Sequence, residues 1–189
     1  MTIKELLLAL LSVMASVSTQ AQDIAVSNNT LFDVTGTISA GIELPVSSKV
    51  SWDLYGSVRP WKRGEESVHK HWSGQAQLRL WNCQVMNGFY WGPYTHVAQF
   101  NIANQGFPLS VFDNLKHNRY EGWLVGGGIG IGYEYILTKH WNIGAEIGAG
   151  YTYIDYKKYE CKKYGKLKDD DVYHYLGISR LGLSIIYVY

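Results

Sequence analysis

Seven ionisable residues stand at alternate positions of segments with a strand-like pattern, and they are the first candidates for chemistry. They are Glu43, Asp53, Arg59, Arg79, Glu134, Glu146 and Arg180. Because successive side chains leave a strand on opposite faces, these residues would share one face and point into a common interior, together with Asp33 and His96. Such a group could carry protons or ions. The alternative is that these residues fill the interior as ion pairs. Ion pairing is the expected outcome because buried charges need partners.

A second candidate is the pair His71 and Ser73, which flank Trp72. A lipid A deacylase barrel uses a histidine and a serine at this spacing, with an acid, on its outer wall. Here both residues share the facing of Arg79, so they would point inward and miss a lipid substrate. His69 and His71 lack the further ligands that a metal site needs. The sequence therefore predicts no catalytic residue, no metal site and no cofactor.

The elements that would position these residues are clearest between Gly122 and Asp155. Apolar and aromatic residues hold the odd positions there, whereas glycine, glutamate and other small or polar residues hold most of the even ones. A period of two predicts β-strands. Glycine on the inner face of a strand often marks a place where something large packs closely, here expected to be interior side chains of other strands.

Aromatic side chains on the opposite face indicate a membrane. Trp141 and Tyr151 share that face, and at about 3.3 Å per residue and a tilt near 40° their separation projects to roughly 25 Å along a barrel axis. That length matches the apolar band of an outer-membrane barrel, with aromatic side chains at both interfaces. The residues assigned to these aromatic girdles are Trp52, Trp72, Trp123, Tyr133, Trp141, Tyr151, Tyr175, Tyr187 and Tyr189.

The beginning of the chain predicts export. Residues 1–21 combine Lys4, an apolar stretch and small residues up to Ala21, which is typical of a secretory signal peptide. Residues 22–189 would form the mature outer-membrane domain. Its formal net charge of +1 gives no argument for nucleic acid binding. Cys83 and Cys161 are expected at opposite ends of the barrel and therefore unpaired within the chain.

The pattern along the chain predicts an all-β fold, an eight-stranded antiparallel up-and-down transmembrane barrel. Residues 24–35 and 37–46 would form the first hairpin. Short turns near Pro45, Cys83 and Lys139 would alternate with longer loops over 62–70, 103–118 and 157–171. Short periplasmic turns and longer extracellular loops are the rule in outer-membrane barrels. The last strand alternates and ends in Tyr189, which fits a signal for the outer-membrane assembly machinery.

Seven segments carry a resemblance to known sequences: TLFDVT, ISAGIE, LRLW, QFNIA, RYEGWLVGGGIGIGYEYIL, HWNIGAEIGAGYTYIDYKKYEC and LGLSIIYVY. Together they resemble a Bacteroidetes-type family of small outer-membrane barrels classified as a domain of unknown function. The resemblance implies a fold and a location but no established activity, and some members are associated with fimbrial gene clusters. The chain departs from the family at Gln77, where a glutamate is common. It also lacks a second cysteine shortly after Cys161, and it has Gly177 to Arg180 in place of Gly-Pro-Thr-Lys.

The sequence thus favours a non-enzymatic outer-membrane barrel whose interior is plugged by side chains. Its partners would be outer-membrane lipid and lipopolysaccharide, the assembly machinery, and a fimbrial or other surface protein contacted by the loops. A lipid-modifying outer-membrane enzyme is the first alternative, and it would need an acid, a base and a nucleophile together on the outer wall or rim. A secreted, soluble ligand-binding barrel is the second, and its outer face would have to be polar.

Overall fold

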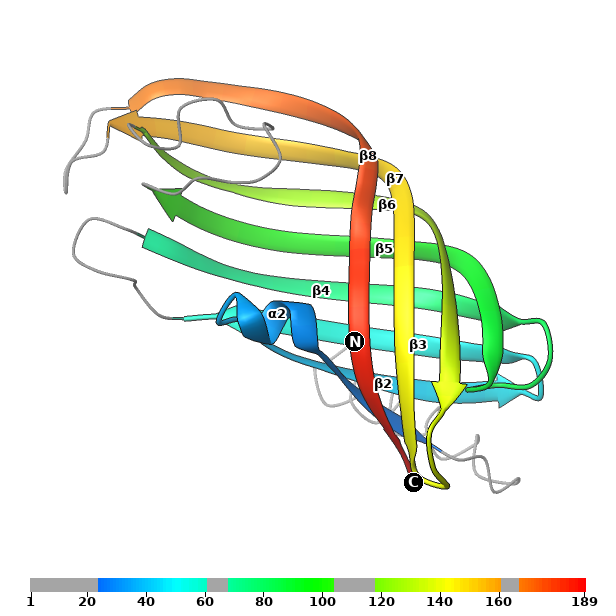
Figure 1. The fold of residues 1–189 in the computed structure, drawn as a ribbon. Helices are drawn as coiled ribbons and strands as arrows, with labels where there is room; N and C mark the ends of the chain where they lie inside the picture. The colour runs from blue at the N-terminus through cyan, green and yellow to red at the C-terminus, as the bar shows by residue number, and fades with distance from the viewer. Residues whose placement is uncertain (1–23, 61–67, 104–117, 161–166) are drawn as a thin grey trace, which may run out of the picture.

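The computed structural model describes residues 24–60, 68–103, 118–160 and 167–189 of the chain. These residues form eight antiparallel strands in chain order, and β1 pairs with β8, so the sheet closes on itself (Figure 1). The strands are β1 (Ala25–Asn29), β2 (Ile38–Ser47), β3 (Val50–Arg59), β4 (Val68–Trp81), β5 (Gly88–Ala103), β6 (Asn118–Ile136), β7 (Trp141–Glu160) and β8 (Leu167–Val188). The predicted all-β, eight-stranded, up-and-down fold is therefore confirmed.

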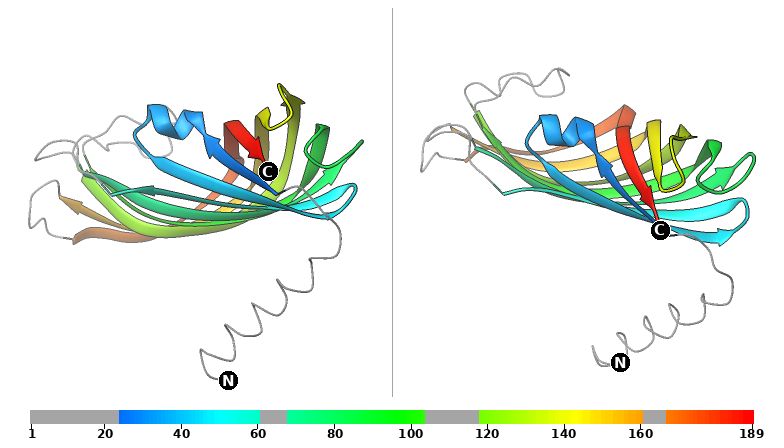
Figure 2. Two further views of the ribbon diagram at one scale, coloured as in Figure 1. Left: turned by 90° about the horizontal axis from the view of Figure 1, so that it is seen from below. Right: turned by 60° about the horizontal axis from the view of Figure 1, so that its bottom comes forward.

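The two ends of the barrel differ. The short connections between β2 and β3, β4 and β5, and β6 and β7 lie together at one end, called the turn end here (Figure 2). At the opposite end, called the loop end here, β3, β5 and β7 end and β4, β6 and β8 begin. The predicted long loops over 62–70, 103–118 and 157–171 fall between these strands in the chain, and residues 61–67, 104–117 and 161–166 lie outside the described residues. Strands extend into the predicted loops, because β4 starts at Val68, β7 continues to Glu160 and β8 starts at Leu167. Lys157 and Asp170 are therefore strand residues that form a cross-strand ion pair of 3.6 Å.

The first hairpin differs from the prediction. Residues Thr30–Val34 form a short helix, α2, where the sequence predicts a continuing strand. Asn29 caps this helix by accepting a hydrogen bond from Leu31 N at 3.1 Å, the contact typical of an asparagine N-cap. Asp33, which is predicted to face the interior, is exposed on α2. The interior charge set therefore loses this member.

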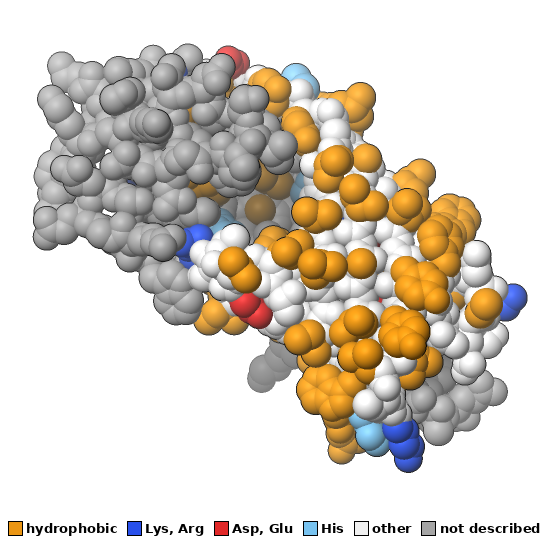
Figure 3. Space-filling model, in the orientation of Figure 1, with side chains coloured by type: hydrophobic (Ala, Val, Ile, Leu, Met, Phe, Trp, Pro, Cys, Tyr) orange, Lys and Arg blue, Asp and Glu red, His pale blue; other side chains and the backbone are white. Residues whose placement is uncertain are grey.

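The outer face of the sheet is apolar. Ile42, Val97, Val125, Ile131 and Ile147 lie there with their side chains substantially exposed, as the alternation predicts. Hydrophobic side chains spread over the region where Figure 1 draws β6, β7 and β8, and the few charged side chains in view lie mainly near the ends (Figure 3). The inner face is the reverse, since four of the five largest fully buried side chains are polar: Gln77, Glu134, Asp53 and Ser51, beside Tyr90.

A β-bulge in β8 reverses the facing of its loop-end half. Gly148 pairs with Arg180 but Ala149 pairs with Ile178, so Ser179 is an extra residue on this strand. On the turn-end side of the bulge Arg180 faces inward, as the alternation predicts, and on the loop-end side Tyr175 packs with the interior residues Phe100 and Ile154. The prediction that Tyr175 faces outward is wrong for this reason. Its neighbour Leu176 takes the outward position and is 81% exposed.

The inward glycines of β6 and β7 leave space for interior side chains from other strands. A Cβ added to Gly130 would lie 2.6 Å from Gln77 Nε2, and one added to Gly148 would lie 2.7 Å from the Tyr94 ring. An added Cβ at Gly132 would collide with the Tyr90 ring. These glycines therefore give the opposite wall room to place its large side chains, as their inward position predicts.

Three layers of side chains fill the interior from the turn end to the loop end. The first is apolar and contains Ala25, Met86 and Ile186; Met86 comes from the β4–β5 turn and adopts a positive φ of 63°. The second, the charge network, contains Glu43, Asp53, Arg79, Glu134, Glu146 and Arg180. The third, the aromatic layer, contains Phe100, Tyr120 and Ile154, with Ile102, Leu124, Tyr156 and Tyr175 packed against them.

Among the described residues, no helix has the length and apolar character needed to cross a membrane.

Candidate functional site

Arg79 of β4 is the centre of the charge network. Its Nη1 donates to Glu43 Oε2 at 2.5 Å and to Glu134 Oε1 at 3.2 Å. Its Nη2 lies 3.2 Å from Asp53 Oδ2 and donates to Glu146 Oε2 at 3.4 Å. One guanidinium therefore contacts four carboxylates from four different strands, all of them almost fully buried.

Two neutral side chains fix the remaining surface of the Arg79 guanidinium. Its Nε donates to Gln77 Oε1 at 3.1 Å, and its Cζ lies 4.5 Å from the centre of the Tyr90 ring. The Tyr90 hydroxyl in turn donates to Glu146 Oε2 at 3.2 Å. A cation over an aromatic ring is stabilised by the ring quadrupole, and more so when water is excluded. Arg79 is therefore held in one orientation from every side.

Arg180 of β8 contacts two of the carboxylates that Arg79 also contacts. Its Nη2 donates to Asp53 Oδ2 at 2.7 Å, and its Nε lies 2.8 Å from Glu146 Oε1. The neighbouring Ser179, the bulge residue, forms a 2.5 Å hydrogen bond with the Tyr94 hydroxyl. The bulge thus gives β8 two consecutive inward contacts.

Glu43 is also held from the turn end. Ser51 Oγ donates to Glu43 Oε1 at 2.5 Å, and Trp81 Nε1 donates to Ser51 Oγ at 2.8 Å. The network with these neighbours joins β2, β3, β4, β6, β7 and β8. A network of connected side-chain hydrogen bonds makes an interior rigid when its polar groups have hydrogen-bond partners.

The charges of the network do not balance. Four carboxylates share two guanidinium groups, so full ionisation would leave two excess negative charges in a buried layer. Removing either arginine would enlarge this excess, and a buried charge without a partner is costly. The network is therefore most vulnerable at its arginines, and above all at Arg79.

Arg59 is the one predicted network member that the structure separates from the others. It faces inward and is buried on β3, next to His71 in the register, at the loop end. No carboxylate of the described residues pairs with it. The alternation of β3 correctly predicts that Arg59 faces inward. It does not show at which height along the barrel axis the side chain lies.

Sequence reasoning missed Ser51, Trp81 and Tyr90, although a signal for them was present. Ser51 shares the parity of Asp53, and Trp81 shares that of Arg79, so both had to face inward. Tyr90 has the parity of the predicted inward residues Tyr94 and His96. Extending the alternation to the turn ends of β3, β4 and β5 would have identified all three.

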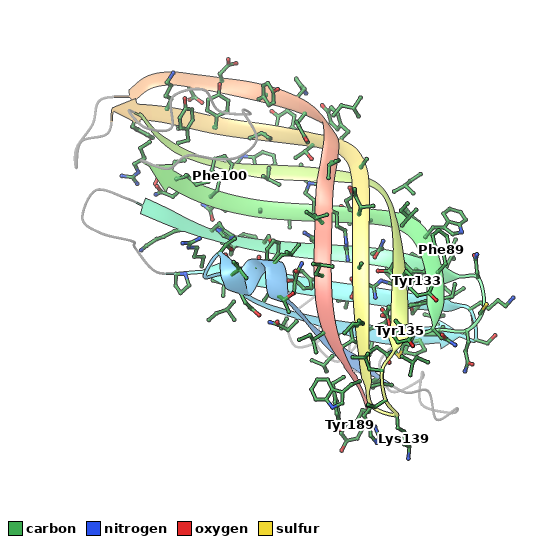
Figure 4. The ribbon with its side chains drawn as sticks, viewed as in Figure 1. Phe89, Phe100, Tyr133, Tyr135, Lys139 and Tyr189 are labelled. Carbon is green, nitrogen blue, oxygen red and sulfur yellow. The ribbon has the colours of Figure 1, made fainter. Side chains whose placement is uncertain are left out.

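The aromatic residues assigned to the girdles lie on the outer face, with Tyr175 as the exception given above. Trp52, Trp72, Trp123, Tyr133, Trp141, Tyr151, Tyr187 and Tyr189 all have substantially exposed side chains. Figure 4 shows Tyr135 and Tyr189 near Lys139 at the turn end, with Tyr133 and Phe89 farther from it, whereas the interior residue Phe100 lies toward the loop end. Trp141 and Tyr187 pack edge to face, with ring centres 5.0 Å apart. On the outer face, Trp72 and Trp123 lie toward the loop end, so aromatic groups are present near both ends.

The His71 and Ser73 pair has the inward geometry that its parity predicts. Ser73 Oγ lies 2.7 Å from Ser57 Oγ on β3, so its hydroxyl contacts another interior hydroxyl. Among the described residues, no three histidine, cysteine, aspartate or glutamate side chains form a group that could hold a metal ion. Cys83 is exposed in the β4–β5 turn, and Cys161 lies outside the described residues.

Comparison with known proteins identifies a family whose function is unknown. No curated protein matches the chain. The model of a family described as a protein of unknown function, DUF3575, matches residues 6–189, which is nearly the whole chain. The chain therefore belongs to this family.

Proposed function

We propose that the mature protein is a small, non-enzymatic barrel of the bacterial outer membrane, with a plugged interior and loops that contact surface or envelope components. Residues 1–21 act as its signal peptide. The observation that carries this proposal is the inverted distribution of side chains. Isoleucine, valine, leucine and tryptophan cover the outer face, whereas the best-buried side chains include Asp53, Glu134 and Gln77. A barrel in water needs the opposite arrangement, and a barrel in lipid needs this one.

The layered interior supports the plugged state. An eight-stranded barrel is only just wide enough for its side chains to fill the interior. Here Met86 lies in the layer at the turn end, and the buried charge network lies behind it. We therefore assign the charges a structural role, in which they cross-link the wall and leave no continuous water path.

The last strand supports assembly by the outer-membrane machinery. Ile185, Tyr187 and Tyr189 follow one another on the outer face of β8, and the backbone N–H of Tyr189 donates to Ile24 O at 2.9 Å. The loop end is then extracellular, which makes it the surface for contacts with fimbrial or other exported proteins and with lipopolysaccharide.

Cell fractionation tests the location. We expect the protein in the outer-membrane fraction, soluble only in detergent, with a gel mobility that changes on heating as folded barrels unfold. Recovery of the wild-type protein from the periplasm or medium without detergent would contradict the proposal and favour a secreted barrel.

Planar-bilayer recording tests the plug. Purified, folded protein should give almost no current, because the charge network and the Met86 layer occupy the interior. Large, steady single-channel steps from the wild-type protein would refute the structural role of these charges, even if the protein is in the outer membrane.

A further inference from the structure

A polar groove crosses the outer face at the loop end, directly beside the apolar part of the wall. Its volume is about 640 Å³, and strands β3 to β7 line it. Two successive rows of outward side chains form most of its surface. The first row runs through Trp72, Gln99, Trp123 and Asp155, which are register partners on β4 to β7.

The second row lies one step closer to the loops and is charged. It runs through Lys70, Asn101, Glu121 and Lys157, again register partners on neighbouring strands. The outward residues on the other side of the first row include Val97, Val125 and Tyr153, so the wall changes from apolar to charged across the groove. That change is the signature of a membrane interface, where tryptophan rings are favoured at the level of lipid head groups.

The two tryptophans form fixed aromatic surfaces in the groove. Trp72 Nε1 donates to Gln99 Oε1 at 3.0 Å, and the Trp123 ring lies 5.6 Å from that of Tyr153. Both indoles remain nearly half exposed, at 47% and 44%. Held rings lose little conformational freedom on binding and present an apolar face with a polar edge. The C–H face of a sugar ring matches such a surface.

Some polar side chains of the groove have hydrogen-bond or ion-pair partners among the described residues, and others do not. Glu121 accepts hydrogen bonds from Arg119 and Asn101, and Lys157 pairs with Asp170. The side chains of Lys70 and Asp155 form no hydrogen bond or ion pair with the described residues, and both residues line the groove. An ammonium group suits a phosphate, and a carboxylate accepts hydrogen bonds from sugar hydroxyls.

We infer that this groove binds the phosphorylated sugar head group of a glycolipid in the outer leaflet. The sugar lies on Trp72 and Trp123, its hydroxyls donate to Asp155, and its phosphate contacts Lys70. The acyl chains continue along the apolar wall beside Val97 and Val125. This inference rests on the proposed membrane location, because only a membrane brings a lipid head group to this level of the wall.

Native mass spectrometry of the folded, detergent-solubilised protein tests the inference with three lipid probes: diphosphorylated lipid A, its dephosphorylated form and phosphatidylethanolamine. The wild-type protein should retain diphosphorylated lipid A in preference to the other two. Lys70→Gln should weaken that binding about tenfold, the factor expected for the loss of one charge-assisted contact. Lys139→Gln, at the turn end, is the matched control and should leave it unchanged.

A second pair of variants tests the aromatic surface. Trp123→Leu should reduce lipid A binding, whereas Trp141→Leu at the turn end should not, and heat-dependent gel mobility verifies that each variant is folded. Equal effects of Lys70→Gln and Lys139→Gln, or equal retention of all three lipids, would overturn the groove assignment. Equal binding of the deacylated, water-soluble head group would overturn the assignment to a membrane lipid. If the protein fractionates with the outer membrane but shows no lipid preference, this inference alone fails.

Discussion

The charge network and the aromatic layer both fill the interior, but the first buries charged side chains and the second buries apolar and aromatic ones. At the network, all eight strands surround the interior, so carboxylates from β2, β3, β6 and β7 reach one arginine on β4. The aromatic layer lies closer to the loop end, beyond the ends of β1 and β2, so these two strands supply no side chains there. At this level Phe100, Tyr120 and Ile154 pack against one another. The difference indicates that charge is buried where opposite walls can supply partners.

Arg79→Met should cause the largest loss of stability. It leaves Glu43, Glu134 and part of the remaining carboxylate cluster without a cation, which should cost about 3 to 5 kcal/mol. Unfolding in urea, followed by gel mobility of the liposome-embedded protein, measures this. The loss should shrink as the pH falls, because protonation removes the negative charge of a stranded carboxyl group.

Arg119→Met is the control for that variant. Arg119 pairs with Glu121 at 2.5 Å, but both side chains are about one-third exposed, so the loss should stay below about 1 kcal/mol. Equal losses in the two variants would mean that the network adds nothing that a surface ion pair lacks.

Ile147→Arg should have the second largest effect. Ile147 is on the outer face and pairs with Ile131 across β6 and β7, so a charge there would face lipid at a cost of roughly 2 to 4 kcal/mol. Thr138→Arg, in the exposed β6–β7 turn, should cost little. Folding yields in liposomes compare the two, and indistinguishable yields would contradict the lipid-facing assignment.

Tyr175→Ala tests the aromatic layer and the bulge together. Tyr175 packs against the aromatic layer, so truncation should cost roughly 1 to 3 kcal/mol. Leu176→Ala, one residue away on the outer face, should change the free energy of unfolding much less. Urea titration in detergent measures both, and the reverse order would place Tyr175 outside and the bulge elsewhere.

Arg59→Met should have the smallest effect, within about 1 kcal/mol, because no described carboxylate loses its partner. The same urea titration applied to Arg59→Met and Arg79→Met compares two buried arginines that differ chiefly in their partners. A loss at Arg59 as large as that at Arg79 would show that burial of the arginine, rather than its ion pairs, sets the cost.

The sequence predicts the facing of most strands because alternation is a local property. The positions of Glu43, Asp53, Arg79, Glu134 and Glu146 all follow from it. Alternation does not reveal which inward residues meet across the barrel, since that depends on strand register and tilt. Arg59 was therefore grouped with residues that it does not contact.

The wrong predictions, at Tyr175 and at α2, come from two structural features that an alternating pattern cannot reveal. On the loop-end side of the bulge, Tyr175 and Leu176 are both compatible with either face, so the extra residue Ser179 leaves no mark in the pattern. At α2, a helix of one turn competes with a strand, and the decisive signal was the Asn29 cap. The bulge lies in the pairing of β8 with β7, whereas the Asn29 cap is a local feature of the sequence.

The narrow seam between the first and last strands has a consequence for biogenesis. β1 and β8 meet over five residue pairs only, and the contact between Asn29 and Leu183 joins residues 154 positions apart. Contacts between such distant residues form late, because the entropy of closing the intervening loop opposes them. A chain that ends before β8 therefore has no strand to pair with β1, and its sheet stays open at that edge.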